Sequence, residues 1–112
     1  MATTATPKAN ATSFVTASAA AYWTLNASVI GNLKEILLAN TSTVASVTVT
    51  LYNVPSAGSA SSGNILCPPV SIAASNFVRI PFNTFLAASG TLQAKADTAS
   101  IATITVSGLE YA

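Results

Sequence analysis

The chain has 112 residues, of which 51% are hydrophobic and only 6% are charged, and its formal net charge is +1. This length suits one domain with its own core, but the charged fraction lies far below the roughly 25% of typical soluble proteins. Four scattered basic side chains form no phosphate-binding patch, so nucleic acid is not expected. No window of about 20 residues is predominantly apolar without Ser, Thr, Asn or a charged residue, so a membrane span is not expected.

The N-terminal segment contains almost no large apolar side chains, and Pro7 blocks a helix there. We therefore expect residues 1–13 to form an extended arm and residues 14–112 to form the folded domain. The segment imitates a signal peptide, but it lacks an apolar centre of roughly seven or more residues. Cytoplasmic synthesis is the expectation that follows.

The next segment, SFVTASAAAYWTLN, is predicted to form strand because its aromatic and β-branched residues outweigh the triple alanine. Tyr22 and Trp23 are adjacent, so in a strand they point to opposite faces and one can lie outside the core. Exposed aromatic side chains are common interface anchors. Phe14, Tyr22 and Trp23 are the candidate interface residues, although Trp23 fits a role in the core equally well.

The stretch from Leu33 to Gly58 carries the strongest strand pattern. In its second half, β-branched and apolar residues at 47, 49 and 51 alternate with Thr and Tyr, which is typical of a half-buried strand. The segments Leu33–Ala39 and Val47–Val54 are interpreted as a β-hairpin or as two neighbouring strands of one sheet. Gly31-Asn32 predicts a tight turn or a bulge before them.

The remainder alternates between short strands and turns. After a Ser- and Gly-rich surface loop at residues 55–64, strands are predicted at Val70–Ile72, Phe77–Phe82, Leu92–Ala96 and Thr103–Tyr111. A single helical turn is expected at Phe85–Ala88. About seven or eight short strands indicate an all-β fold, a single β-sandwich of the jelly-roll or Ig-like kind. The predicted core residues are Val47, Val49, Leu51, Val78, Ile80, Phe82, Ile104 and Val106.

Catalytic chemistry is not expected from this composition. The chain has no histidine, which removes Ser-His-Asp and Cys-His catalysis and most transition-metal sites. Its three acidic residues are far apart in the sequence and its glycines form no phosphate-binding loop. Cys67 is interpreted as a small buried hydrophobe at a strand end rather than a reactive thiol. We predict no enzyme, no catalytic residue, no cofactor and no metal.

Several strand and turn motifs, in the same order, resemble those of small virion structural proteins of tailed bacteriophages. The motifs are Asn40-Thr41-Ser42, the strand from Val47 to Pro55, Asn64-Ile65-Leu66 and Val106-Ser107-Gly108-Leu109-Glu110. The resemblance covers Leu33 to Tyr111. It implies a non-enzymatic virion protein, most simply a capsid cement or decoration protein that contacts the major capsid protein or another virion protein. The alternative is a tail or head-fibre component, with a receptor-facing carbohydrate-binding module as one form.

Low charge combined with high hydrophobicity also favours self-association, because little repulsion keeps free monomers apart. We expect a homo-oligomer, with a trimer as the first hypothesis by analogy to cement proteins. The N-terminal arm is expected to extend to a neighbouring subunit and pair with a strand edge, since main-chain hydrogen bonds require few particular side chains.

Overall fold

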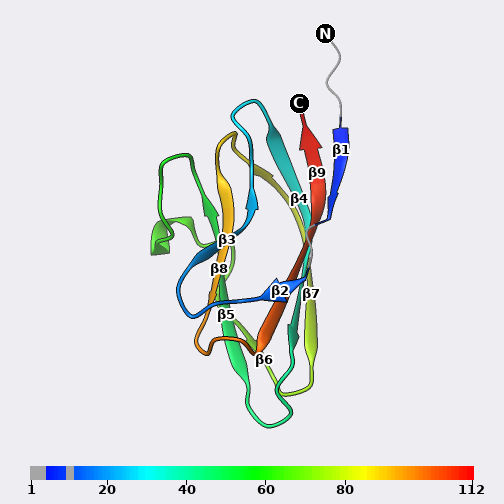
Figure 1. Cartoon of the computed structure of the whole chain (residues 1–112), viewed down its shortest axis with the longest axis vertical. Coiled ribbons are helices and arrows are strands. Elements are labelled where there is room, and N and C mark those ends of the chain that lie inside the picture. The colour runs from blue at the N-terminus through cyan, green and yellow to red at the C-terminus, as the bar shows by residue number, and fades with distance from the viewer. Residues whose placement is uncertain (1–4, 10–11) are drawn as a thin grey trace.

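The protein is a sandwich of two antiparallel β-sheets in a computed structural model that describes residues 5–9 and 12–112 (Figure 1). The first sheet has the order β1-β9-β4-β7, and β2 also pairs with β9. Its strands are β1 (Ala5–Ala9), β2 (Ser13–Phe14), β4 (Ile30–Asn40), β7 (Phe77–Leu86) and β9 (Ala102–Tyr111). The second sheet has the order β3-β8-β5-β6. Its strands are β3 (Ala20–Thr24), β5 (Val47–Val54), β6 (Val70–Ile72) and β8 (Thr91–Ala96).

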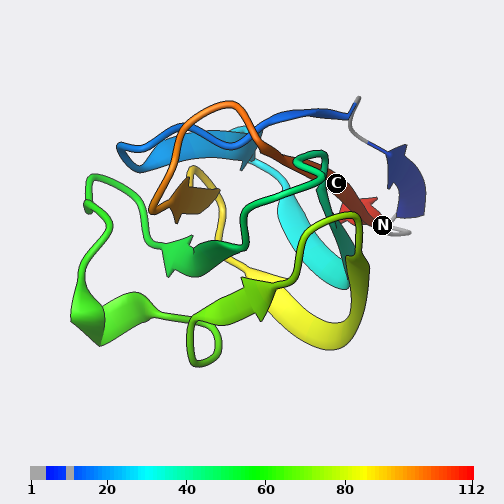
Figure 2. The same cartoon turned by 90° about the horizontal axis from the view of Figure 1, so that it is seen from below.

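Seen along the long axis of the molecule, the two sheets form two layers that face one another (Figure 2). Within the described residues the helical content is one short 3₁₀ turn, η1 (Ser62–Asn64). The predicted all-β sandwich is therefore confirmed, with nine strands in the described residues where about seven or eight were expected.

The predicted core residues fill the space between the sheets. Val47, Val49, Leu51, Ile104 and Val106 are buried. Val78, Ile80 and Phe82 are partly buried and pack against this cluster. These three lie on β7, which is the last strand of its sheet, so the outer side of the strand leaves their side chains partly open to solvent.

The predicted pairing of the segments Leu33–Ala39 and Val47–Val54 is wrong, because they lie in different sheets. β4 pairs with β7 and β9, whereas β5 pairs with β6 and β8. Both strands have one buried face. Two such faces can be buried by stacking across the core as well as by lying side by side, so the alternating pattern alone could not decide between these arrangements.

Asn40 fixes the crossover between the two sheets. Its side chain is buried, and its Nδ2 donates hydrogen bonds to the carbonyl oxygens of Ala45 (2.8 Å) and Ile72 (3.0 Å). Its Oδ1 accepts a hydrogen bond from the Ser42 backbone N–H at 2.9 Å. One amide side chain thus ties the end of β4 to the connecting loop and to β6.

Of the two alternatives predicted at Gly31-Asn32, a tight turn or a bulge, the turn is wrong, since β4 runs through both residues. A Cβ atom at Gly31 would lie 3.0 Å from Leu25 Cδ2 and 3.1 Å from Trp23 Cζ2, so the glycine permits close packing rather than a turn. The irregularity occurs slightly later: the register of β4 shifts between Leu33 and Glu35 against both of its neighbours.

The predicted helical turn at Phe85–Ala88 is replaced by the end of β7 and a tight turn. β7 continues to Leu86, and the Gly90 N–H then donates to the Ala87 carbonyl at 2.9 Å. Ser89 has a φ of 62° in this turn. Such left-handed backbone costs a non-glycine residue about 1–2 kcal/mol, so the turn is set by the strands it joins rather than by local preference.

Part of the predicted N-terminal arm forms a strand of the same chain. β1 runs antiparallel to β9, with Ala5 opposite Tyr111 and Lys8 opposite Gly108. Residues 1–4 and 10–11 of the arm lie outside the described residues. The boundary between arm and domain at residue 13 stays a prediction.

Candidate functional site

The three candidate interface residues take different positions. Trp23 is only 2% exposed and belongs to the core, where its indole Nε1 donates a hydrogen bond to Glu110 Oε2 at 2.8 Å. Tyr22 is half-buried, and its hydroxyl accepts from the Thr16 N–H (3.0 Å) and donates to the Phe14 carbonyl (3.2 Å). Phe14 itself is 50% exposed. Its ring is therefore the one of the three that is most available to a partner.

Phe14 lies at one end of a row of side chains that crosses the first sheet. Successive strands pair Phe14 with Thr103, Thr103 with Ala39, and Ala39 with Phe77. Directly opposite residues in an antiparallel sheet point to the same face. This face is the outer one, since the neighbouring residues Ile104 and Leu38 are buried in the core.

We call these four residues the aromatic row. Phe77, at its other end, is 67% exposed, and the two residues between the rings are small. The row therefore presents two exposed aromatic rings separated by a shallow surface two strands wide. Sequence analysis did not single out Phe77, although the alternation that placed Val78 and Ile80 toward the core already placed Phe77 outside.

The face around the aromatic row carries little net charge. Arg79, next to Phe77 on the same outer face, has its Nε 3.6 Å from Glu35 Oε1 on the adjacent strand. Both side chains are open to solvent, so the pair adds little to stability. Its consequence is that these two charges offset one another beside the aromatic row.

The free edge of β7 is unsuited to regular strand addition. The Asn40 N–H donates to the Asn76 carbonyl at 2.9 Å, so these two residues form a hydrogen-bonded pair. Such pairs alternate along antiparallel strands, so the backbone N–H and C=O groups of even-numbered residues of β7 point toward β4 and those of odd-numbered residues point outward. Pro81 is one of those outward residues, and it has no N–H to offer. The register of β7 against β4 also shifts beside Pro81. A second strand could therefore pair with this edge only over a short stretch.

The opposite edge of the sheet is covered by β1, and that cover is weakly held. The Val15 N–H donates to the Ala102 carbonyl at 2.8 Å. By the same alternation, the backbone N–H and C=O groups of even-numbered residues of β9 point toward β1 and β2. Thr6 opposite Glu110 and Lys8 opposite Gly108 are then the hydrogen-bonded pairs. Each pair makes two main-chain hydrogen bonds, and the resulting four bonds contribute about 1 kcal/mol each. Ordering each backbone residue costs about 1–2 kcal/mol. These bonds alone do not offset the cost of ordering five residues, and the side chains of Ala5, Thr6 and Pro7 are exposed, so β1 is weakly held.

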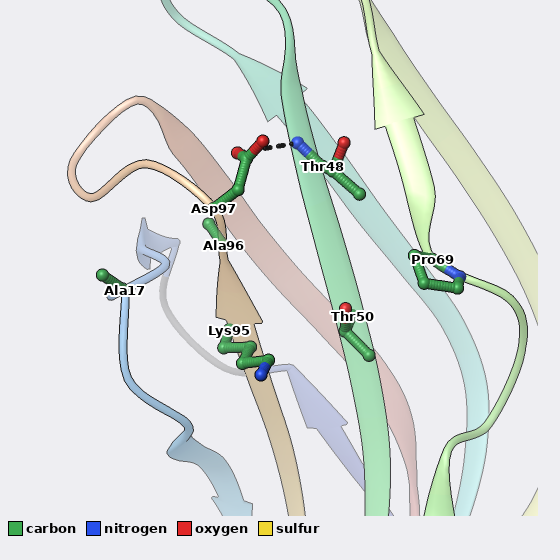
Figure 3. Close-up of a pocket in the computed structure, with 7 residues that line it drawn as sticks. All are labelled: Ala17, Thr48, Thr50, Pro69, Lys95, Ala96 and Asp97. Atoms are coloured by element: carbon green, nitrogen blue, oxygen red, sulfur yellow. Dashed lines mark hydrogen bonds between the residues drawn. The ribbon is translucent and has the colours of Figure 1, made fainter. Parts of the chain in front are cut away.

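A hollow of about 330 Å³ lies on the outer side of the second sheet (Figure 3). Figure 3 shows Thr50 and Lys95 on neighbouring strands, with Ala17 on one side and Pro69 on the other. Asp97 Oδ1 at its rim accepts a hydrogen bond from the Thr48 N–H at 3.0 Å. The carboxylate is thus engaged in holding the turn after β8, and the lining offers one ammonium group and two hydroxyls but no nucleophile with a base beside it.

The remaining polar chemistry is sparse in the described part of the chain. Among residues 5–9 and 12–112, no three His, Cys, Asp or Glu side chains come close enough to hold a metal ion. Cys67 is half-buried, and burial raises the pKa of its thiol above the ordinary value. The described residues contain no helix with the length and apolar character needed to cross a bilayer.

Comparison with known proteins supports the fold. No protein-family model matches the chain, and no curated protein matches it in sequence. Among solved structures, a Bacillus endospore appendage protein, described as one of a novel family of disulfide-linked pili, matches with a TM-score of 0.53 at 14% identity over 97% of this chain and 87% of that chain.

Two infectious bursal disease virus structures are also similar. The Gx strain structure has a TM-score of 0.48 at 10% identity over 99% of this chain and 33% of that chain. The T13 particle has a TM-score of 0.47 at 11% identity over 97% of this chain and 30% of that chain. This chain therefore spans about a third of the virus chains, and at these identities the likeness concerns the fold alone.

Proposed function

We propose that this chain is a non-enzymatic structural subunit of a bacteriophage virion and that it acts as a capsid cement or decoration protein. In this role it stabilises the capsid through contacts with the major capsid protein or another virion protein. The observation that carries the proposal is the aromatic row, with Phe14 and Phe77 exposed at the two ends of a nearly neutral sheet face.

The aromatic row can supply enough energy for a specific contact. Covering the exposed half of a phenylalanine side chain removes roughly 100 Å² of apolar surface from water, which is worth about 2–3 kcal/mol. Two rings at the ends of one row would both be covered by a partner that lies flat across the four strands. The paired Arg79 and Glu35 would impose no requirement for an oppositely charged partner.

The experiment is to measure binding to capsids prepared without the protein. Changing Phe14 and Phe77 together to Ser should weaken binding at least tenfold, as expected when about 1.4 kcal/mol or more is lost. Phe85→Ser is the matched control, because Phe85 is also an exposed phenylalanine of β7, at 61%, but lies outside the row. The melting temperatures of all variants should stay close to that of the original protein. If the row and control variants bind capsids equally well, the row is not the contact.

A tail or head-fibre component is the second candidate. It is favoured by the structural likeness to a protein described as forming pili and by the elongated shape of the subunit, whose principal extents are 53 × 25 × 19 Å. The copy number in purified virions separates the two, since a cement protein is present in amounts similar to the major capsid protein and a fibre component in far fewer copies. A glycan-binding screen tests the receptor-facing form, with the hollow near Lys95 as the place to mutate.

In either role we propose that the subunit is a homo-oligomer, with a trimer as the first hypothesis. The low charge of the chain supports this, because the surface offers little repulsion between copies. Sedimentation equilibrium over micromolar concentrations would give the mass directly. A monomer throughout this range, and on the particle as well, would rule the oligomer out.

A further inference from the structure

We propose that β1 is an exchangeable strand: in the assembled state it leaves β9 of its own chain and pairs, in the same register, with β9 of an adjacent copy. This inference rests on the proposed function in one respect, namely that copies of the chain lie next to one another. It goes further by naming the segment that links them and the edge that receives it.

The first support is how little side-chain contact holds β1 in place. Ala5, Thr6 and Pro7 are exposed and Lys8 is half-buried, so no apolar side chain of these four is anchored in the core. Figure 1 shows β1 beside the end of β9, close to the C-terminus and away from the second sheet. The main-chain pairing with β9 is therefore the chief attachment of this strand.

The second support is that the edge of β9 is left open when β1 departs. Without β1, the outward backbone groups of Gly108 and Glu110 would have no partner strand, and proteins rarely leave such an edge open. Any copy of the chain offers the same edge. Pairing within a chain and pairing between chains therefore make identical contacts, and the choice between them depends on how close the neighbouring copy lies.

The third support is that the base of the arm is fixed independently of β1. β2 pairs with β9 at Ser13 and Phe14, and Thr12 Oγ1 lies 2.6 Å from Thr105 Oγ1 in a hydrogen bond between the two hydroxyls. Exchange of β1 would thus leave β2 and the core unchanged. Only three residues separate β1 from β2, so the receiving copy must lie within roughly 10 Å of the base of the arm.

Pro7 determines what the exchange can build. It lies opposite Leu109, between the two hydrogen-bonded pairs, so its backbone groups face away from β9. Since proline has no N–H to donate, a further strand can pair only poorly with the outer edge of β1. Each β9 edge therefore receives one strand and then stops, which gives links between defined copies rather than an open-ended sheet.

The test uses single-cysteine chains of full length in a Cys67→Ala background. Ala5 and Tyr111 are directly opposite and form a non-hydrogen-bonded pair, in which Cα atoms lie about 4.5 Å apart, a separation that a disulfide can span. Chains with Ala5→Cys and chains with Tyr111→Cys are mixed, concentrated until they assemble, and oxidised mildly. Disulfide-linked heterodimers are then counted by mass spectrometry.

The proposal predicts that this pair forms heterodimers roughly tenfold or more above a control pair of Ala5→Cys with Ser71→Cys, because Ser71 is exposed on β6 in the other sheet. Equal yields for both pairs would overturn it. So would a chain carrying both Ala5→Cys and Tyr111→Cys that, in the assembled state, forms only internal disulfides. Capsid binding is measured separately, so a protein that binds capsids without exchange refutes only this inference, and exchange without capsid binding refutes only the proposed function.

Discussion

Replacing Gly108 by Ala tests how the core is built at the end of the sandwich that carries Trp23. A Cβ atom at this position would collide with the backbone oxygen of Asn32 on the adjacent strand and would lie 2.8 Å from Trp23 Cη2. Neither neighbour can move easily, because Asn32 is part of the β4–β9 pairing and Trp23 is buried and hydrogen-bonded to Glu110. The extra methyl group must therefore push two strands apart or displace the indole.

The expected loss follows from the packing. Forcing an additional carbon into a well-packed core costs about 1–3 kcal/mol. Unfolding entropy near the melting temperature is about 2.1 cal/mol/K per residue, so a domain of this length loses roughly 4 °C for each kcal/mol. Gly108→Ala should therefore melt about 8 °C lower for a loss of about 2 kcal/mol, measured by circular dichroism and by urea titration.

Gly63→Ala is the matched control. Within 4 Å, a Cβ atom at Gly63 would meet only Ser61 Oγ, at 3.8 Å, and the residue lies in the surface turn η1. This variant should melt within about 2 °C of the original protein or slightly higher, since alanine restricts the unfolded chain more than glycine does. If Gly108→Ala is as stable as Gly63→Ala, the close approach of β4, β9 and Trp23 is not as described.

Three further outcomes are expected. Asn40→Ala should lower the unfolding free energy by about 1–3 kcal/mol, because it leaves buried backbone groups of the crossover without their partners; an unchanged urea midpoint would contradict this. Because burial raises the pKa of the Cys67 thiol, the unfolded chain loses that proton first, and stability should fall as the pH rises above about 8.5; Cys67→Ala should lack this component of the fall, and identical pH profiles would contradict the assignment. Pro81→Thr restores an N–H on the free edge of β7 and should increase edge-to-edge association, seen as light scattering at high concentration; no increase would mean that the edge is protected by something other than the proline.

Local alternation predicted the strands and much of the core, because the period of two survives wherever one face of a strand is buried. It could not predict which strands pair. β4 and β5 follow one another in the chain and both have a buried face, yet Asn40 directs the chain from one sheet to the other. The partners of its amide include Ile72, which lies 32 residues away. A pattern confined to one segment contains no information about such a bond.

The same limit applies to the candidate interface. Adjacent aromatic residues in a strand must point to opposite faces, but choosing Trp23 as the buried one requires knowing that Gly108 leaves room for the ring and that Glu110 accepts the indole proton. These residues follow at the far end of the chain. Phe77 shows the reverse case. The pattern of β7 implied its outward position, but only the pairing of β2, β9, β4 and β7 places it in one row with Phe14.

The edge strands of the two sheets limit uncontrolled strand addition in a chain with few charges. Many proteins protect edge strands with charged side chains, especially lysine, but only 6% of this chain is charged. Here β1 and β7 each carry an outward-facing proline, β6 has three residues, and the pairing of β3 is interrupted by a register shift. Each of these features limits strand addition without using charge. Under the proposed function, this leaves two places for association: the sheet face that carries the aromatic row, and the edge of β9, whose covering strand is weakly held.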